Sequence, residues 1–312
     1  MSARAASLAG RRPRGDQGRR TTGTPLRPAG NLRRRAAISR AAELAMASAA
    51  ALAVALLVDV VATVVANGAP AISLAFLTQP SRGLAGGGIA NALVGSAVMV
   101  ALAAAIAIPL GVLIGLLLSE VAPGSRLASA LELVLDMLQG LPTVLVGVFV
   151  FGLIVTAEHK ETGLAGAVAL SIIMLPLIAR SSQQVLALVP GTLREAADAL
   201  GVDRWRAVLG VTLPAAAGGI ATGALLAIAR AAGETAPLLL VDGLYDPAAF
   251  QLDPIAHGVP SVPMFIYTTY DLPAPSALSL AWGAALVLLS GVLVANIGAR
   301  ILLARSRRRM GL

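Results

Sequence analysis

The chain alternates between long apolar segments and shorter polar connections, and six of the apolar segments are long enough to cross a lipid bilayer. A helix needs about 20 apolar residues to span the hydrocarbon core. The pattern predicts spanning helices at residues 44–65, 89–118, 134–155, 164–178, 215–241 and 277–303. The expected fold is therefore all-α: a polytopic membrane protein with six transmembrane helices.

Two of these segments depart from a simple span. The third is interrupted by Gly140-Leu141-Pro142-Thr143, where the proline removes a backbone donor and disfavours a helical residue before it. The fourth, residues 164–178, has only 15 residues. It either extends at both ends, into Gly163 and Arg180, or lies in a buried environment.

Composition supports a membrane protein and excludes several kinds of site. Hydrophobic residues make up 57% of the chain and charged residues 13%, whereas soluble domains carry about 25% charged residues. The chain has no cysteine, so it has neither disulfides nor thiolate metal sites. Its two histidines, His159 and His257, are far apart in the sequence. We therefore expect neither a metal site nor a cofactor.

Basic residues are concentrated at the two ends of the chain. Residues 1–40 contain eleven arginines and a single acid, Asp16, and residues 305–312 are also rich in arginine. Segments rich in Arg and Lys beside a span are retained in the cytoplasm. We interpret both ends as cytoplasmic tails, the first of them disordered. Residues 41–66 are then the first transmembrane helix, and residues 86–304 form the main transmembrane domain.

The same rule orients the connections between the spans. Connections on the side of the tails hold five arginines outside the spans, whereas those on the opposite side hold only Arg82 and Lys160. Both termini are therefore expected in the cytoplasm. The connections at residues 66–88, 156–163 and 242–276 are expected to face outward.

The cytoplasmic connection at residues 180–213 is predicted to contain two short helices. Thr192 and Glu195 have the spacing of a capping box at the start of the first helix. Gly201 suits the left-handed position that ends that helix. Asp203 is placed to cap the second helix, and Pro214 suits the first turn of the span that follows.

A helix–Gly–helix segment of this kind also resembles a DNA-binding helix-turn-helix. Such a domain needs a three-helix core, and too few residues separate this segment from the spans on either side. We therefore expect no nucleic acid among the partners. A membrane-anchored regulator of transcription would need a soluble helical domain that this sequence lacks.

The connection carries a specific resemblance. Glu195-Ala196-Ala197 is followed after three residues by Gly201, after nine more by Val211, and after one more by Leu213-Pro214. This pattern is similar to the loop signature of bacterial ABC-importer permeases, with valine in place of isoleucine at one position. In that family the short helix docks on the ATPase subunit. The resemblance therefore implies an ATPase-coupling role for six residues: Glu195, Ala196, Ala197, Gly201, Leu213 and Pro214.

A second segment narrows the resemblance. Arg230-Ala231-Ala232-Gly233-Glu234-Thr235-Ala236-Pro237 looks like the fifth-span segment of phosphate-importer permeases of the PstA type. Shorter matches support it at Gly87-Gly88-Ile89, Pro109-Leu110-Gly111, Leu118-Ser119-Glu120 and Gly140-Leu141-Pro142-Thr143. Thr143 stands where that family usually has serine, and Gly95-Ser96 where it often has Gly-Thr. The resemblance covers about residues 86–304.

The resemblance implies a multi-pass permease of the bacterial inner membrane, with inorganic phosphate as its cargo. Its expected partners are two copies of an ATP-binding subunit, a second homologous permease subunit and an extracytoplasmic phosphate-binding protein. The chain has no phosphate-binding Gly-x4-Gly-Lys-Ser/Thr loop and no nucleophile–base arrangement. It is therefore expected to be a transport subunit and not an enzyme.

Arg230, Glu234 and Thr235 are the candidate residues of the translocation path. A charge inside an apolar span costs roughly 2.5–3.5 kcal/mol on insertion scales, which makes it a functional hypothesis. Arg230 and Glu234 are four residues apart, so one helical face would hold both. The planar guanidinium matches an oxyanion, and Thr235 adds a hydroxyl group. The pair either gates the path for an anion or locks the helix to its neighbours.

Two other transporters remain as alternatives. A permease for another oxyanion, such as sulfate or molybdate, would have similar chemistry. An ion-coupled secondary carrier would carry internal repeats and membrane-buried ion ligands. The sequence shows neither clearly, and that alternative leaves the docking loop at residues 180–213 unexplained.

Overall fold

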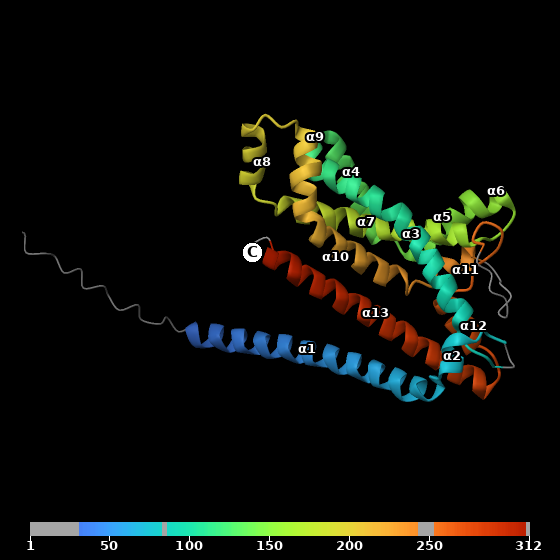
Figure 1. Ribbon diagram of the computed structural model, residues 1–312. Helices are drawn as coiled ribbons and strands as arrows, with labels where there is room; N and C mark the ends of the chain where they lie inside the picture. Colours follow the sequence, from blue (N-terminus) through green and yellow to red (C-terminus); the bar gives the residue numbers. More distant parts are fainter. Residues whose placement is uncertain (1–30, 83–85, 243–252, 310–312) are drawn as a thin grey trace, which may run out of the picture. The chain divides into compact units, whose positions relative to one another are not determined.

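The computed structural model describes residues 31–82, 86–242 and 253–309, and every regular element in these ranges is a helix (Figure 1). Within the same ranges, β-type pairing is limited to one isolated antiparallel bridge between Ser81 and Gly87. The prediction of an all-α fold is therefore confirmed for the described residues. The chain divides into two compact units, residues 1–58 and 59–312.

Helix α1 (Leu32–Gly68) contains the predicted first span. Its apolar side chains are exposed, for example Leu44 (71%) and Leu52 (62%), as in a helix that faces lipid. Because α1 begins at Leu32, the prediction of disorder is wrong for residues 32–40, where arginine and alanine favour the helix. Residues 1–30, the rest of that predicted tail, lie outside the described residues.

The core of the second unit is formed by α3 (Ala90–Leu116), α7 (Gly163–Ala187) and α10 (Leu213–Ala231). Buried side chains from all three meet in one cluster, which includes Met99, Leu170, Met174, Ile178 and Ala227. The α3 and α7 backbones approach closely at Gly111, where an added Cβ would lie 2.7 Å from Cγ2 of Ile178. Small residues thus let these spans pack tightly.

The third predicted span is a bent pair of helices. Helix α4 (Arg126–Gly140) and helix α5 (Thr143–Val150) meet at an angle of 105°. The residue before Pro142 is extended, as the proline ring requires, and this breaks the helix. Helix α5 continues through the π-helical turn η4 (Phe151–Val155) into α6 (Thr156–Glu158).

The fourth predicted span is longer than its apolar run and is also buried. Helix α7 extends from Gly163 to Ala187, and 61% of its most apolar window lies inside the structure. Both explanations offered for its short apolar segment are therefore confirmed. Arg180 lies within this helix and not in the connection after it.

The fifth span is displaced relative to the prediction. It runs without a break from Arg204 to Ala231 through α9 (Arg204–Ala207), the π-helical turn η5 (Val208–Thr212) and α10. Pro214 therefore lies inside a continuous helix and does not begin a separate one. Pro214 has no N–H to donate to the carbonyl one turn earlier, and in a regular α-helix its ring would clash with that carbonyl. The wider π-helical turn η5 beside it relieves the clash. The end predicted at residue 241 is wrong, because the chain turns after Ala231 and re-forms only α11 (Leu238–Val241).

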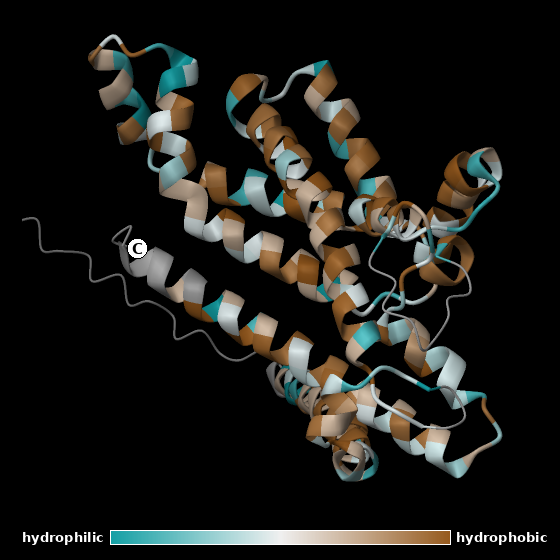
Figure 2. Ribbon diagram, turned by 45° about the vertical axis from the view of Figure 1, so that its right-hand side comes forward, coloured by the Kyte–Doolittle hydropathy of each residue, from teal (hydrophilic) through white to brown (hydrophobic). Residues whose placement is uncertain are grey.

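Helix α13 (Pro275–Arg309) contains the sixth predicted span and continues through part of the predicted C-terminal tail. Residues 310–312 lie outside the described residues. Short helices interrupt the remaining connections: η1 (Ala69–Ala71), α2 (Leu74–Thr78) and α12 (Val262–Tyr270). In the described part of the chain, five helices are long and apolar enough to cross a membrane, and the α4–α5 pair can supply a sixth. Figure 2 shows apolar residues along these helices and polar residues gathered at the connections.

Candidate functional site

The connection between α7 and α9 carries a short amphipathic helix, α8 (Gly191–Ala199), that projects from the packed helices (Figure 1). Ala197 is its buried residue. Glu195 and Ala196 are exposed, and the side chains of Leu193 and Leu200 are 41% and 82% exposed. Apolar side chains are thus displayed on an otherwise polar connection.

The C-terminal end of α8 is formed as the sequence predicted. Gly201 has a φ of +70°, the left-handed region that favours glycine. Its N–H donates to the carbonyl oxygen of Asp198 at 3.0 Å, and the N–H of Val202 donates to that of Ala197 at 3.1 Å. These two bonds form a Schellman motif, which fixes the direction of the chain after α8.

The N-terminal end of α8 corrects the prediction. The helix begins at Gly191 with Pro190 at the N-cap, and no side chain caps it. Thr192 therefore lies inside the first turn, and the predicted capping box with Glu195 is wrong. Asp203 does occupy the N-cap position of α9, but its carboxylate makes no capping bond and instead lies 3.7 Å from Nε of Arg206.

A buried ion pair fastens the base of α8 to the end of α3. Glu120 lies in the π-helical turn η3 (Leu117–Val121) that follows α3, and its side chain is 7% exposed. Arg194 of α8 donates to both carboxylate oxygens, from Nη2 to Oε1 at 2.5 Å and from Nε to Oε2 at 3.1 Å. This two-bond geometry is the strong form of an arginine–carboxylate pair.

Arg194 and Arg204 extend this contact to the backbone. Arg194 also donates to the carbonyl oxygens of Leu186 and Val189, both at 2.9 Å. Arg204, at the start of α9, donates to the backbone carbonyl of Glu120. One residue at the end of α3 therefore holds both sides of the α8 connection.

The contact between Glu120 and its two arginines was not predicted from the sequence. Glu120 appeared only in the motif Leu118-Ser119-Glu120, and Arg194 is one of the five arginines used to orient the connections. They are 74 residues apart, so no local spacing rule connects them. The signal available in the sequence was the position of Glu120 directly after an apolar span. A carboxylate that becomes buried there needs a partner.

Leu213 and Pro214 lie where the connection re-enters the core. Leu213 packs against a buried cluster formed by Leu186, Val189, Ala216 and Ile220. Pro214 follows directly, after the π turn η5. The two residues thus fix the path of the fifth span and are not part of the exposed face of α8.

A second polar cluster joins α4 to α7. Arg180 of α7 donates from Nη2 to Oδ1 of Asp136 at 2.5 Å and to the backbone carbonyl of Glu132 at 3.1 Å. Gln183 donates from Nε2 to Oε1 of Glu132 at 2.8 Å. The side chain of Arg180 is 22% exposed, so water screens these charges only partly. The cluster ties the first half of the bent pair to the most buried helix.

Arg230 and Glu234 are neighbours, but not in the predicted arrangement. Helix α10 ends at Ala231, so Glu234 lies beyond it and the two do not share a helical face. Nε of Arg230 is 3.8 Å from Oε1 of Glu234, an ion pair too long for a hydrogen bond. The Arg230 side chain is 56% exposed and that of Glu234 is 17% exposed. The arginine is therefore loosely held and more than half exposed.

Arg230 borders a small cavity at the break between α4 and α5. The cavity has a volume of about 40 Å³, and Gln139 and Thr143 also line it. Gln139 donates from Nε2 to the carbonyl oxygen of Pro176 at 3.5 Å. Residues that carry a guanidinium, an amide and a hydroxyl group thus line one cavity. Thr235, the third predicted residue of the path, does not line this cavity.

Asp242, which directly follows α11, is a buried acid that was not identified from the sequence. Its Oδ1 accepts from the N–H of Val259 at 2.9 Å, while its Oδ2 has no partner among the described residues. Burial raises the pKa of this carboxyl to about 7, and the nearby charge of Glu161 also raises it. Asp242 thus ties the connection between α11 and α12 to the end of α11.

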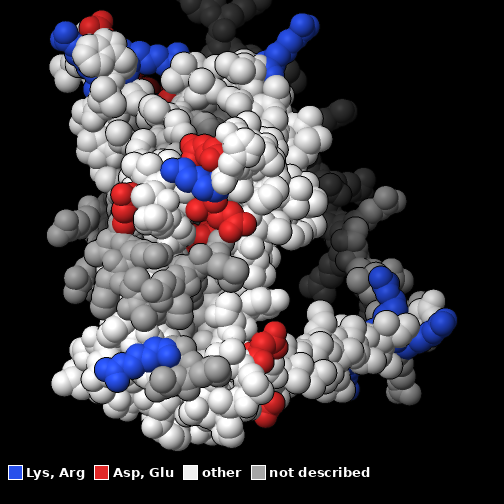
Figure 3. All heavy atoms as spheres, turned by 90° about the vertical axis from the view of Figure 1, so that its right-hand side faces the viewer, with Lys and Arg blue, Asp and Glu red and all other residues white. Residues whose placement is uncertain are grey.

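Charges elsewhere on the side of the spans where Asp242 lies are sparse. Figure 3 shows a face on which they form small separate groups within a mostly uncharged surface. Asp253 accepts from the N–H groups of Ile255 and Ala256, and these bonds lower the pKa of its carboxyl. Within the described ranges, no three His, Asp or Glu side chains are placed to hold a metal ion.

Comparisons with known proteins agree with this geometry. Residues 107–308 match the family described as "Binding-protein-dependent transport system inner membrane component". The phosphate transport system permease protein PstA of Yersinia pestis is 37% identical over 253 residues, which cover 80% of this chain and 85% of that protein. PstA 1 of Mycobacterium tuberculosis (strain ATCC 25618 / H37Rv) is 38% identical over 229 residues, which cover 72% of this chain and 73% of that protein.

The fold is shared with a solved transporter. An inward-facing structure of the MetNI methionine ABC transporter aligns with a TM-score of 0.54 and 20% identity. The alignment covers 69% of this chain and 96% of that chain. The spanning helices, the projecting α8 and the family match over most of the chain lead to one conclusion. The chain belongs to the family of inner membrane components of binding-protein-dependent transport systems.

Proposed function

We propose that this chain is the permease subunit of an ATP-driven importer of inorganic phosphate, and that it forms part of the translocation path. The relatives that cover most of its length carry that function in their names. The single observation that carries the proposal is the convergence of Arg230, Gln139 and Thr143 on one cavity at a break between helices. Arginine suits phosphate because its planar N–H groups match the oxyanion geometry.

The chain is a transport subunit, and ATP hydrolysis occurs in a separate chain. We infer that α8 is the surface on which an ATP-binding subunit docks. The exposed Leu193, Ala196 and Leu200 provide an apolar face, and Glu195 adds charge beside it. Gly201 holds the helix in this position through its left-handed turn. The buried Glu120–Arg194 pair then carries a displacement of α8 to α3.

The proposed gate works by exchange of partners at Arg230. In the resting state the guanidinium lies beside Glu234 at 3.8 Å, without a hydrogen bond. An incoming phosphate offers shorter, charge-assisted bonds and competes for the same N–H groups. The hydroxyl of Thr143 and the amide of Gln139 lie on the same cavity and add donors. Thr235, directly after Glu234, contributes a further hydroxyl to the turn.

The assembly follows from the same proposal. Two ATP-binding subunits, a second homologous permease and an extracytoplasmic phosphate-binding protein would complete the importer. The arginine distribution supports placing both termini, and α8 with them, in the cytoplasm. The outer connections would then meet the phosphate-binding protein.

A double substitution tests the role of Arg230. Arg230→Gln with Glu234→Gln removes the ion pair without leaving either charge unpaired. We expect normal abundance of the complex in the membrane and loss of most uptake of radiolabelled phosphate. Asp203→Asn with Arg206→Gln, which removes an exposed pair at the opposite end of the same span, is the matched control and should transport normally.

Normal phosphate uptake by the Arg230–Glu234 double variant would show that the pair only stabilises the fold. Sulfate and molybdate uptake, measured in the same cells, separates phosphate from the other oxyanions. Uptake of either ion that exceeds phosphate uptake in the unmodified protein would contradict the assigned cargo.

A further inference from the structure

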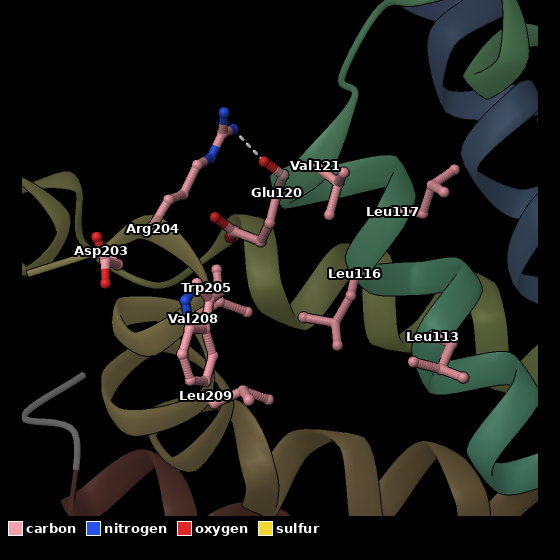
Figure 4. Close-up of a pocket in the computed structure, with 10 residues that line it drawn as sticks. All are labelled: Leu113, Leu116, Leu117, Glu120, Val121, Asp203, Arg204, Trp205, Val208 and Leu209. Atoms are coloured by element: carbon pink, nitrogen blue, oxygen red, sulfur yellow. Dashed lines mark hydrogen bonds between the residues drawn. The ribbon is translucent and has the colours of Figure 1, made fainter.

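An apolar groove opens between the end of α3 and the start of the fifth span, remote from the cavity at Arg230. It has a volume of about 720 Å³, within the range of about 300–1,000 Å³ that is typical of ligand pockets. Figure 4 shows Leu113, Leu116 and Leu117 on one wall. Trp205, Val208 and Leu209 form the other wall.

One end of this groove is polar, and its charges do not balance. The carboxylate of Glu120 is occupied by Arg194, and that of Asp203 lies 3.7 Å from Arg206. Arg204 donates to a backbone carbonyl and has no carboxylate partner among the described residues. The groove therefore combines long apolar walls with one uncompensated cation at its end.

The position of the groove along the span sets its depth in a membrane. The helix from Arg204 to Ala231 has 28 residues, or about 42 Å at 1.5 Å per residue, whereas the hydrocarbon core is about 30 Å thick. About eight residues must therefore extend beyond the core. Trp205, which is 61% exposed, is among the first residues of the helix, and tryptophan favours the headgroup level.

We propose that this groove binds an anionic phospholipid from the leaflet on the side of α8. The acyl chain lies between the leucines of α3 and Val208, and the headgroup phosphate pairs with Arg204. A zwitterionic lipid would fill the apolar walls equally well, but its ammonium group offsets the charge of its phosphate and so weakens its attraction to Arg204. Arg204 also donates to the backbone carbonyl of Glu120. A lipid bound at Arg204 therefore lies beside the contact that holds the α8 connection.

The native tryptophans provide a direct test. The chain contains two, and Trp282→Phe leaves Trp205, which lines the groove, as the only reporter. The full chain is reconstituted in vesicles that mix phosphatidylglycerol and phosphatidylcholine, with bromine on the acyl chains of one lipid at a time. Brominated lipid quenches Trp205 fluorescence when its acyl chain lies against that side chain, so unequal quenching by the two lipids reports a preference of the groove.

We expect phosphatidylglycerol to be favoured about fivefold over phosphatidylcholine, the equivalent of about 1 kcal/mol for one cation near the surface. Arg204→Gln should bring the preference close to one. Arg126→Gln, which removes an exposed cation that does not line the groove, should keep it. In the Trp282→Phe chain, 1 M salt should also remove the preference, because the Debye length is then about 3 Å. That salt measurement needs no substitution at Arg204 and is decisive even if Arg204→Gln does not fold.

Three results would overturn the proposal. Equal quenching by both brominated lipids would mean that bulk lipid fills the groove without headgroup recognition. No quenching by either would mean that protein covers the groove or that it lies outside the membrane. An unchanged preference in a folded Arg204→Gln variant would remove Arg204 from the site.

Discussion

The buried pair of Glu120 and Arg194 should be worth several times more than an exposed pair of the same charges. The Glu120 side chain is 7% exposed and that of Arg194 is 33% exposed, and two hydrogen bonds join them. Removing one partner of a buried pair costs about 3–5 kcal/mol. Because Arg194 is partly exposed and keeps two carbonyl acceptors, we expect the lower end, about 3 kcal/mol, for Glu120→Ala.

The interaction itself is measured by a double-mutant cycle with Glu120→Gln and Arg194→Gln. Thermal or denaturant unfolding of the full chain in detergent gives the four stabilities. Residues in direct contact show coupling energies of about 0.5–3 kcal/mol, and this geometry predicts about 2 kcal/mol. The control is the same cycle on Asp203 and Arg206, whose side chains are 65% and 66% exposed and which should couple by less than about 0.5 kcal/mol. Equal coupling in both cycles would refute the claim that burial makes Glu120 an anchor of α8.

Three further predictions concern α8, the topology and pH. Gly201→Val should strain the left-handed turn by about 1–2 kcal/mol and reduce co-purification of the ATP-binding subunit, whereas Gly201→Asn should be tolerated. Unchanged co-purification of that subunit with the valine variant would exclude the docking role. Single cysteines at positions 160 and 255 should react with an impermeant thiol reagent in intact cells and one at position 198 should not, so labelling of position 198 alone would reverse the orientation. The pKa of Asp242 rises from 3.8 to about 7 on folding, so its stabilising contribution is full below pH 3.8 and is lost as pH increases through 7. Asp242→Asn should therefore flatten the fall in melting temperature between pH 4 and 8, and an unchanged slope would contradict the burial of this carboxyl.

Much of the fold follows from local sequence rules, and the exceptions have physical causes. The spans, the break before Thr143 and the turn at Gly201 depend on apolar length, proline and glycine, which act over a few residues. The capping box at Thr192 failed because the helix begins two positions earlier than predicted, with Pro190 at the N-cap. The shared helical face of Arg230 and Glu234 failed because α10 ends between them. Periodicity alone gave no sign of that end, since the apolar run continues to residue 241.

The candidate site was only partly accessible from the sequence. The exposed face of α8 and the position of Arg230 were expected from motifs, because each motif lies within one short segment. Their neighbours were not, since Glu120 meets Arg194, and Arg230 shares a cavity with Gln139, only through packing of distant segments. A sequence read without contacts can identify a charge that needs a partner, but not which residue supplies it.

The continuous helix from Arg204 to Ala231 connects these two regions. Arg204 at its start is bonded to Glu120, the residue that also holds α8, and Arg230 near its end borders the cavity at the α4–α5 break. A helix of about 42 Å moves largely as one body, so a displacement of α8 reaches Arg230 without a chain of intermediate contacts. Under the proposed function, the distance between the docking surface and the anion site is therefore bridged by one secondary-structure element.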